Sequence, residues 1–289
     1  MAAATPGITH IEDPGGRRAL QLESDDARVV IALTGAQVLS WLTPRGDVLW
    51  TASYPEFAPN KPVRGGIPLV FPWFGDHPDR RDLPAHGFAR NLDWRCTAEG
   101  PGPVVVLSTN DDDATRAMWP HRFGLELTVA LATELKLTLG IENRGDATFR
   151  CEHALHTYFA VGDVRQATVH GLEGLPCVEQ ATDGEGAWDH AAPLHFRAET
   201  DRIFQDTPDA LTLRAPALDR TVRLTTVGAK SAIVWNPWIA KAARLSQLDP
   251  ADWRRFCCIE AANVREHAID VAPGQRHVLE LRVACSAAG

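Results

Sequence analysis

Apolar residues alternate with polar or small ones in two neighbouring segments of this chain. In residues 125–132 leucine and valine side chains occupy every second position, and residues 135–142 repeat the pattern. Successive side chains of a β-strand point to opposite faces of its sheet, so this period of two predicts half-buried strands. The short interval at Thr133 and Glu134 predicts that the two strands form a hairpin.

Further short apolar runs, bounded by glycine, proline and aspartate, are also predicted to be strands. They cover residues 28–33, 37–42, 104–109, 222–226, 232–235, 257–260 and 277–285. Helical patterns are few, and the best begins with Asp249 as N-cap and Pro250 at the first helical position. Because strands and helices do not alternate, we predict an all-β fold, a large antiparallel β-sandwich with long loops and few short helices.

The chain has the length and apolar content of one large domain. All-β domains of about this size are common as single units, and 45% hydrophobic residues are enough for a sizeable core. The sequence contains no short internal repeat and no low-complexity linker. We therefore predict a single domain over residues 1–289, with its core at about 28–285.

The charge balance and the cysteines limit the expected partners and compartment. Lysine and arginine number 29 against 37 aspartates and glutamates, a net charge of −8. This argues against non-specific binding to nucleic acid or to an anionic membrane, although a local arginine cluster can still bind a small anion. The six cysteines lack metal-ligand spacing, and we find no secretion signal or membrane-spanning apolar run. We therefore expect reduced thiols in a cytoplasmic protein without a metal site.

A long segment rich in glycine, proline and aromatic residues, 64–94, is the best candidate for a binding surface. Arg64 precedes two glycines, where the backbone can approach a ligand closely. His86 and Arg90 lie four residues apart in the same segment. Aromatic faces, guanidinium groups and an imidazole together suit a small polar anion such as a sugar phosphate.

Two apolar strand segments carry isolated polar residues. In residues 151–159 a period of two puts His156 on one face with Tyr158, and His153 on the other. Such a histidine is either a hydrogen-bonded structural residue or a residue that faces a cleft. Glu260 is a lone carboxylate in an apolar strand, where burial without a partner is costly. It is either a general base with a raised pKa or a strand-end residue pointing into solvent.

A third polar group surrounds Asp201, which can accept hydrogen bonds from sugar hydroxyls or cap a turn. Trp235 and Trp238 flank a turn signal and belong either to a pocket wall or to the core. Nucleophile triads, P-loops and dinucleotide fingerprints are absent from the sequence.

Six blocks of this sequence, taken in order, resemble one family. They are RGGIPLVFPWFG, LPAHGFARNLDW, EHALHTYF, ETDRIF, VWNPW and RFCCIEAANV. The pattern is similar to that of the glucose-6-phosphate 1-epimerases, or hexose-6-phosphate mutarotases, of the galactose-mutarotase-like, aldose 1-epimerase superfamily. The resemblance covers about residues 29–285, and the first two blocks together are specific. It implies a galactose mutarotase-like supersandwich with a sugar cleft on one sheet.

The resemblance also implies roles for named residues. His156 corresponds to the family's general acid and Glu260 to its general base. These two residues would open and reclose the sugar ring, which requires only proton transfers and no cofactor. The expected ligand is accordingly a small-molecule sugar phosphate, and nothing in the sequence demands more than a monomer.

The remaining implied contacts hold the substrate. Arg64, His86 and Asp201 fall on positions that bind the sugar in relatives, and Arg90 with Arg64 resembles the phosphate-contacting arginines. Arg80–Arg81 lies between the first two blocks, where relatives vary, and a further phosphate contact there stays open.

Three other functions fit parts of the pattern. The first is a mutarotase of unphosphorylated galactose or glucose, which would not depend on Arg90. The second is a carbohydrate-binding sandwich without turnover, which need not retain both His156 and Glu260. The third is a metabolite-sensing protein, because one fold can host unrelated functions.

Overall fold

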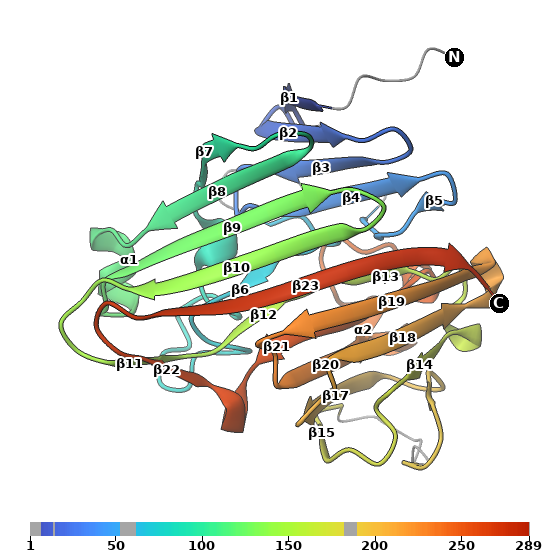
Figure 1. Ribbon diagram of the computed structural model, residues 1–289. Coiled ribbons are helices and arrows are strands. Elements are labelled where there is room, and N and C mark those ends of the chain that lie inside the picture. The colour runs from blue at the N-terminus through green and yellow to red at the C-terminus, as the bar shows by residue number, and fades with distance from the viewer. Residues whose placement is uncertain (1–6, 14, 53–61, 182–189, 289) are drawn as a thin grey trace.

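The computed structural model describes residues 7–13, 15–52, 62–181 and 190–288. Over these residues the chain consists of antiparallel strands joined by loops, with two short α-helices, α1 (Asp113–Met118) and α2 (Trp238–Ala242) (Figure 1). The all-β prediction is therefore confirmed. None of these helices is long and apolar enough to cross a membrane.

Two large antiparallel sheets form the sandwich. From edge to edge, the nine-stranded sheet contains β16 (Leu194–His195), β14 (Thr168–His170), β18 (Ala210–Ala215), β19 (Arg220–Val227), β23 (Arg276–Ala287), β10 (Leu135–Asn143), β9 (Phe123–Leu131), β8 (Val104–Asn110) and β7 (Arg95–Glu99). The seven-stranded sheet contains β15 (Cys177–Glu179), β17 (Thr200–Gln205), β20 (Ser231–Asn236), β21 (Phe256–Asn263), β12 (His153–Leu155) and β6 (Leu69–Val70), with β13 (Tyr158–Ala160) paired to β21.

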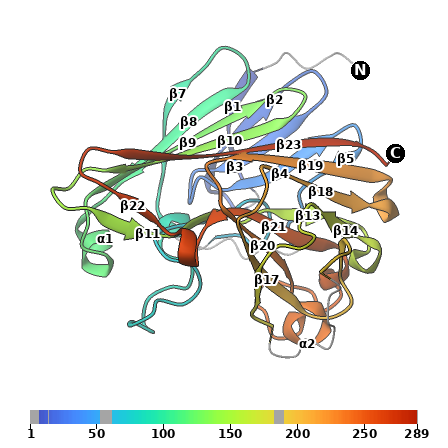
Figure 2. The ribbon, with the colours of Figure 1, turned by 60° about the horizontal axis from the view of Figure 1, so that its bottom comes forward.

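Two smaller sheets complete the fold. The five-stranded sheet contains β1 (Gly7–Glu12), β2 (Arg18–Glu23), β3 (Arg28–Ala32), β4 (Val38–Thr43) and β5 (Gly46–Asp47), and the two-stranded sheet contains β11 (Phe149–Cys151) and β22 (Ile269–Val271). Strands β1 and β2 thus precede residue 28. Figures 1 and 2 show the nine-stranded sheet as one layer, with the seven-stranded sheet against one of its faces.

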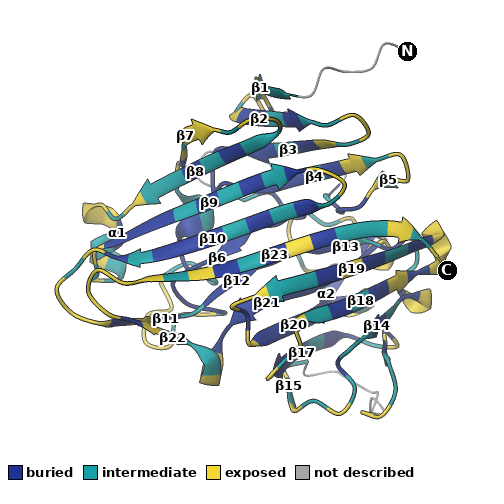
Figure 3. Cartoon of the chain, viewed as in Figure 1, coloured by how far each residue is buried: buried dark blue, intermediate teal, exposed yellow. Residues whose placement is uncertain are grey.

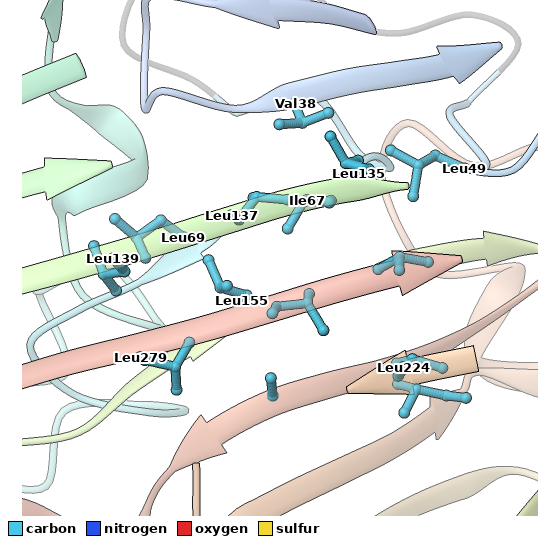
Figure 4. Close-up of a cluster of buried hydrophobic side chains, with 14 of the residues drawn as sticks. Val38, Leu49, Ile67, Leu69, Leu135, Leu137, Leu139, Leu155, Leu224 and Leu279 are labelled. Carbon is cyan, nitrogen blue, oxygen red and sulfur yellow. The ribbon is translucent and has the colours of Figure 1, made fainter. Parts of the chain in front are cut away.

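The core between the layers follows from the alternation in the sequence. Leu135, Leu137 and Leu139 of β10 are fully buried, while the residues between them are half-exposed (Figure 3). Their side chains lie beside Ile67 and Leu69, in and next to β6 of the opposite layer (Figure 4). Each such side chain stabilises the sandwich by roughly 1.5–3 kcal/mol. The predicted hairpin is confirmed, because β9 pairs with β10 from Leu135 and Leu131 onward.

The seven-stranded sheet is buried on both faces at its centre. Every residue of β21 is buried. Cys257 and Ile259 contribute to the core between the layers, whereas Phe256 and Cys258 belong to a separate aromatic cluster with Trp50 on the other face. That second face, turned away from the nine-stranded sheet, carries the cleft described below. All six cysteines are free thiols, as expected.

The α-helix predicted from Asp249 does not form. The Asp249 side chain accepts the hydrogen bond of an N-cap from the Ala251 N–H (2.9 Å), as predicted, but only a 3-10 turn follows, η4 (Asp252–Arg254). Helix α1 begins instead at a capping box, in which Asp112 and Thr115 each accept a hydrogen bond from the other's backbone N–H. The other 3-10 turns are η1 (Ala89–Asn91), η2 (Val164–Gln166), η3 (Pro216–Leu218) and η5 (Arg265–His267).

Gly66 holds the loop after Arg64 against the sheet, and its replacement is expected to destabilise the fold. Its φ is +61°, and an added Cβ would lie 2.0 Å from the Val38 carbonyl oxygen. Gly66→Ala should lower the free energy of unfolding by about 1–3 kcal/mol from backbone strain alone, and further through this clash. Gly274→Ala is the control, because its φ is +71° but no atom lies within 4 Å. Equal urea unfolding midpoints for the two variants would contradict the expectation.

Candidate active site

A cleft of about 580 Å³ opens on the second face of the seven-stranded sheet. It is lined by Arg64, Phe74, Gly75, Asp76, Ala85, His86, Arg90, His156, Tyr158, Gln180, Asp201, Ile233, Trp235, Lys241, Leu245 and Glu260. The structure therefore brings all six candidate residues from the sequence into one cavity, although they are spread over nearly 200 positions of the chain.

Antiparallel register explains why the central side chains meet. Residues Leu155 and Tyr158 pair with Ala261 and Cys258 of β21, and the same register puts His156 opposite Glu260. Glu260 also pairs with Ile233 on its other side. His156, Glu260 and Ile233 thus form one row of neighbours across the strands. Side chains two residues apart share a face, so Tyr158 and Cys258 form a second row beside it.

Asp201 extends this second row. It pairs with Trp235, and Trp235 in turn pairs with Cys258. The floor of the cleft thus consists of two parallel rows of cross-strand neighbours. One row carries the histidine and the glutamate, and the other carries the aspartate and two aromatic rings.

His156 and Glu260 form a buried pair. His156 Nε2 lies 3.4 Å from Glu260 Oε1, and the two side chains are 10% and 1% exposed. The imidazole stacks on the Tyr158 ring with centroids 4.8 Å apart and an angle of 9°. His156 Nδ1 and Glu260 Oε2 have no hydrogen-bond partner among the described residues. Each member of the pair therefore has a buried polar atom that no described residue satisfies.

Burial sets the protonation of this pair. It raises the pKa of the Glu260 carboxyl well above its usual range, with a further increase from Asp201 and an opposing effect of Arg90. It lowers the pKa of His156 well below its usual range, as do the neighbouring His86, Arg90 and Arg64. Both shifts favour the uncharged forms of the two side chains. A single proton shared by the pair gives two uncharged groups when it is on Glu260, and the imidazolium and the carboxylate when it is on His156.

His86 is held as a neutral hydrogen-bond donor. The Gly75 N–H donates to His86 Nδ1 (3.2 Å), so the ring proton is on Nε2. Burial, helped by the Arg90 charge, lowers the pKa of His86 to about 3. The ring lies edge-on to His156, with centroids 5.9 Å apart. His86 can thus donate to an oxygen in the cleft without carrying a charge.

The two arginines are braced from different sides. Arg64 Nε donates to the Ser246 carbonyl oxygen (2.8 Å), and its backbone N–H donates to Gln247 Oε1 (3.1 Å). Arg90 Nη2 donates to the Ala85 carbonyl oxygen (2.7 Å), while its buried Nε has no partner among the described residues. Both guanidinium groups keep donors for an anion, which is the geometry that suits a phosphate or carboxylate.

Three residues that the sequence left open, His153, Arg80 and Arg81, are not among those that line the cleft. His153 points away from the cleft, where Asn263 Nδ2 donates to its Nε2 (3.1 Å), and it is a structural residue. Arg80 and Arg81 do not line the cleft. They form exposed ion pairs with Asp82 (2.6 Å) and Asp76 (2.9 Å).

Sequence reasoning missed three polar residues of the cleft, Asp76, Gln180 after β15 and Lys241 on α2. Lys241 Nζ lies 3.5 Å from Asp201 Oδ2, and the Gln180 N–H donates to the Asp201 carbonyl oxygen (2.7 Å). Asp76 lies in the segment 64–94 but was not singled out there. Gln180 and Lys241 stand in no block with a recognisable pattern, so no sequence signal indicated them. The described residues contain no cluster of histidine, cysteine, aspartate and glutamate suited to a metal ion.

The buried histidines give stability a predictable pH dependence. The pKa values of His86 and His153 are each lowered to about 3, mainly by burial. Below about pH 6.5 the unfolded chain therefore binds protons that these rings in the native state do not, and the free energy of unfolding falls as the pH drops toward 3. His86→Gln, whose amide oxygen can still accept the Gly75 hydrogen bond, should flatten this decline by up to about 1.4 kcal/mol per pH unit. Urea titrations at pH 7 and pH 4.5 measure the difference.

The control for that experiment is Val227→Thr. Val227 is 60% exposed and neither side chain titrates, so the replacement should leave the slope unchanged. Parallel curves for wild type and His86→Gln would show that His86 is not held neutral by burial.

Comparisons with known proteins agree with the fold. The model of the aldose 1-epimerase family matches residues 18–284. The chain belongs to the aldose 1-epimerase family, a family of isomerases that act on sugars. This confirms the resemblance seen in the sequence blocks.

Two relatives are similar to this chain over most of their length. A protein of Cenchrus ciliaris is 32% identical over 260 residues, covering 85% of this chain and 77% of the relative. A protein of Escherichia coli K12 is 30% identical over 274 residues, covering 91% of each chain. Both relatives are described as a "putative glucose-6-phosphate 1-epimerase".

Solved structures show the same fold. The crystal structure of a "putative mutarotase" from Salmonella typhimurium superposes with a TM-score of 0.85 at 24% identity, covering 97% of each chain. A galactose mutarotase related enzyme from Lactobacillus acidophilus superposes with a TM-score of 0.75 at 15% identity, covering 93% of this chain and 98% of the other. The galactose mutarotase-like sandwich predicted from the sequence is therefore confirmed.

Proposed function

We propose that this protein interconverts the α and β anomers of a hexose 6-phosphate, with glucose 6-phosphate as the preferred substrate. The observation that carries the proposal is the buried pair of His156 and Glu260, 3.4 Å apart, in a cleft that also holds Arg64 and Arg90. His156 and Glu260 would transfer protons to and from the sugar, and Arg64 and Arg90 would bind its phosphate.

Ring opening in this cleft is a pair of coupled proton transfers. The Glu260 carboxylate removes the proton from the C1 hydroxyl, and the His156 imidazolium protonates the ring oxygen as the C1–O5 bond breaks. The product is the open-chain aldehyde, with Glu260 protonated and His156 neutral. After rotation about the C1–C2 bond, neutral His156 takes the proton back from the O5 hydroxyl while Glu260 returns its proton to O1. The ring closes on the other face, and both side chains regain their starting forms.

The pair keeps the same total charge throughout this cycle. One proton moves between Glu260 and His156 by way of the substrate, so the buried site never gains or loses a net charge. This matters because an uncompensated charge in such a buried place is costly. Burial favours the uncharged form of the pair, which is the form that accompanies the open-chain aldehyde.

The other cleft residues would fix the substrate in register. Arg64 and Arg90 would bind the 6-phosphate through charge-assisted hydrogen bonds. His86 Nε2–H and the Asp201 carboxylate would donate to and accept from the sugar hydroxyls. Holding both ends of the sugar places C1 and O5 against the acid and the base. All these residues come from one chain, so the proposal includes a protein that acts as a monomer.

Two-dimensional proton exchange NMR on glucose 6-phosphate, with and without the protein, tests the function directly. The expected result is protein-dependent exchange cross-peaks between the α and β anomeric protons. Exchange with free glucose or galactose but not with the phosphate would keep the acid and base and overturn the roles of the arginines. Binding of glucose 6-phosphate without exchange of any sugar would show a sensor or a binding protein instead of an epimerase.

A further inference from the structure

Lys241 is a charged residue of the cleft to which the proposed chemistry assigns no role. Its Nζ lies 2.8 Å from Glu199 Oε1 and 3.5 Å from Asp201 Oδ2. The Glu199 and Asp201 side chains are only 8% and 18% exposed, and that of Lys241 is 31% exposed. One ammonium group thus stands between two largely buried carboxylates, one of which faces the substrate space.

The position of Lys241 is fixed by buried contacts at the start of α2. Asn236 is fully buried, and its side-chain amide donates to the carbonyl oxygens of Trp253 and Phe256 (both 2.8 Å). Its Oδ1 accepts from the Trp238 N–H (2.9 Å), and the Trp238 ring packs against Trp253 with centroids 4.3 Å apart. Helix α2 is therefore held in place by a backbone hydrogen bond to Asn236 and by the packing of the Trp238 ring. These contacts hold Lys241 over the cleft.

The same segment of chain also braces an arginine. Ser246 and Gln247, which follow α2, accept hydrogen bonds from the Arg64 side chain and backbone. The stretch from Trp238 to Gln247 thus supports substrate contacts at two places, Asp201 through Lys241 and Arg64 through the later loop.

We propose that Lys241 is a positioning residue that turns Asp201, holding its Oδ2 so that Oδ1 faces the hydroxyls of the bound sugar. The inference rests on the proposed function, because it assumes a sugar in the cleft. A free aspartate side chain samples several rotamers, and an ion pair on one oxygen leaves the other as a fixed acceptor. Burial raises the pKa of Asp201, and Lys241 opposes that rise, so the ammonium also favours the ionised acceptor.

The test compares Lys241→Met, Lys241→Arg and the control Lys230→Met, whose lysine is exposed and lies outside the cleft. Glucose 6-phosphate binding is measured by calorimetry, and anomer exchange by NMR at saturating substrate. Lys241→Met should raise Kd about 10-fold, the loss of one charge-assisted contact, while the saturated exchange rate changes less than about 3-fold. Lys241→Arg should restore most of the affinity, and Lys230→Met should match wild type.

The pH dependence separates positioning from a merely structural role. Without the ammonium the pKa of Asp201 rises further, so binding should begin to weaken at a higher pH during acidification in Lys241→Met than in wild type. The phosphate of the ligand titrates equally in the wild-type and Lys241→Met experiments. A difference between their pH dependences of binding therefore comes from the protein. If Lys241→Met does not fold, Lys241→Gln, which keeps a donor without the charge, takes its place in every measurement.

A double-mutant cycle with Asp201→Asn completes the design. Adding Lys241→Met to Asp201→Asn should change Kd less than about 2-fold, because no carboxylate remains to be positioned. Additive losses, or an unchanged Kd and pH dependence in Lys241→Met, would overturn the inference. Wild type that binds glucose 6-phosphate without exchanging its anomers would reject the proposed function, while the Kd values would still decide the role of Lys241.

Discussion

Glu260→Gln is expected to lower the rate of anomer exchange by about 10²–10⁴-fold, the usual contribution of a positioned general base. The amide keeps the shape of the side chain and can still contact His156 Nε2, but it cannot accept the proton of the C1 hydroxyl. The wild-type carboxyl is buried with a pKa well above its usual range. Its replacement by a neutral amide should therefore leave the unfolding midpoint nearly unchanged. Exchange NMR on glucose 6-phosphate measures the rate.

His156→Asn is the partner experiment. His156→Asn should lower the exchange rate by a similar factor. The double variant should be at most about 3-fold slower than the slower single variant, because the effects of groups that act as a unit are not additive. The control is His153→Asn, which alters a buried histidine on the opposite face, paired with Asn263. It should affect stability more than the exchange rate of the folded protein. Retention of more than about a tenth of the wild-type rate in Glu260→Gln would exclude Glu260 as the base.

Arg90→Met should lower kcat/KM for glucose 6-phosphate, the proposed substrate, much more than kcat/KM for free glucose. Losing a charge-assisted hydrogen bond costs about 1.5–3 kcal/mol, which corresponds to about 10- to 150-fold in kcat/KM. Arg90 Nε is buried without a partner among the described residues, so an anion that enters the cleft gains a donor already stripped of water. The kcat/KM for free glucose should change less than about 3-fold. Exchange rates for both sugars give the ratio.

The matched control is Arg95→Met on β7, an exposed arginine of the other sheet, which should leave both sugars unaffected. Arg64→Met should resemble Arg90→Met in direction. An equal loss of kcat/KM for glucose and glucose 6-phosphate in Arg90→Met would show that this arginine supports the sugar or the loop and not the phosphate. An unchanged rate for the phosphate would place the anion elsewhere in the cleft.

Local sequence patterns predicted the strands well because most strands have one buried face. In β9 and β10 leucine and valine recur at every second position, and the hairpin pairing followed from this pattern together with the short interval between the strands. The capping signal at Asp249 was right only in part: its side chain accepts from the Ala251 N–H as an N-cap does, but a 3-10 turn follows where an α-helix was predicted. Short-range capping signals are shared by turns and helices, and only the surrounding packing separates them.

The sequence by itself determined the all-β class, because alternation is a local feature, and its resemblance to a known family singled out His156 and Glu260. It could not decide which way Glu260 faces, since every residue of β21 is buried and alternation is invisible in a strand covered on both sides. Only the tertiary structure decided this, by setting the register that puts His156 opposite Glu260 and by packing Cys257 and Ile259 into the core. Lys241 likewise became visible only when α2 was packed over the cleft, because contacts between distant segments depend on the fold and not on sequence spacing.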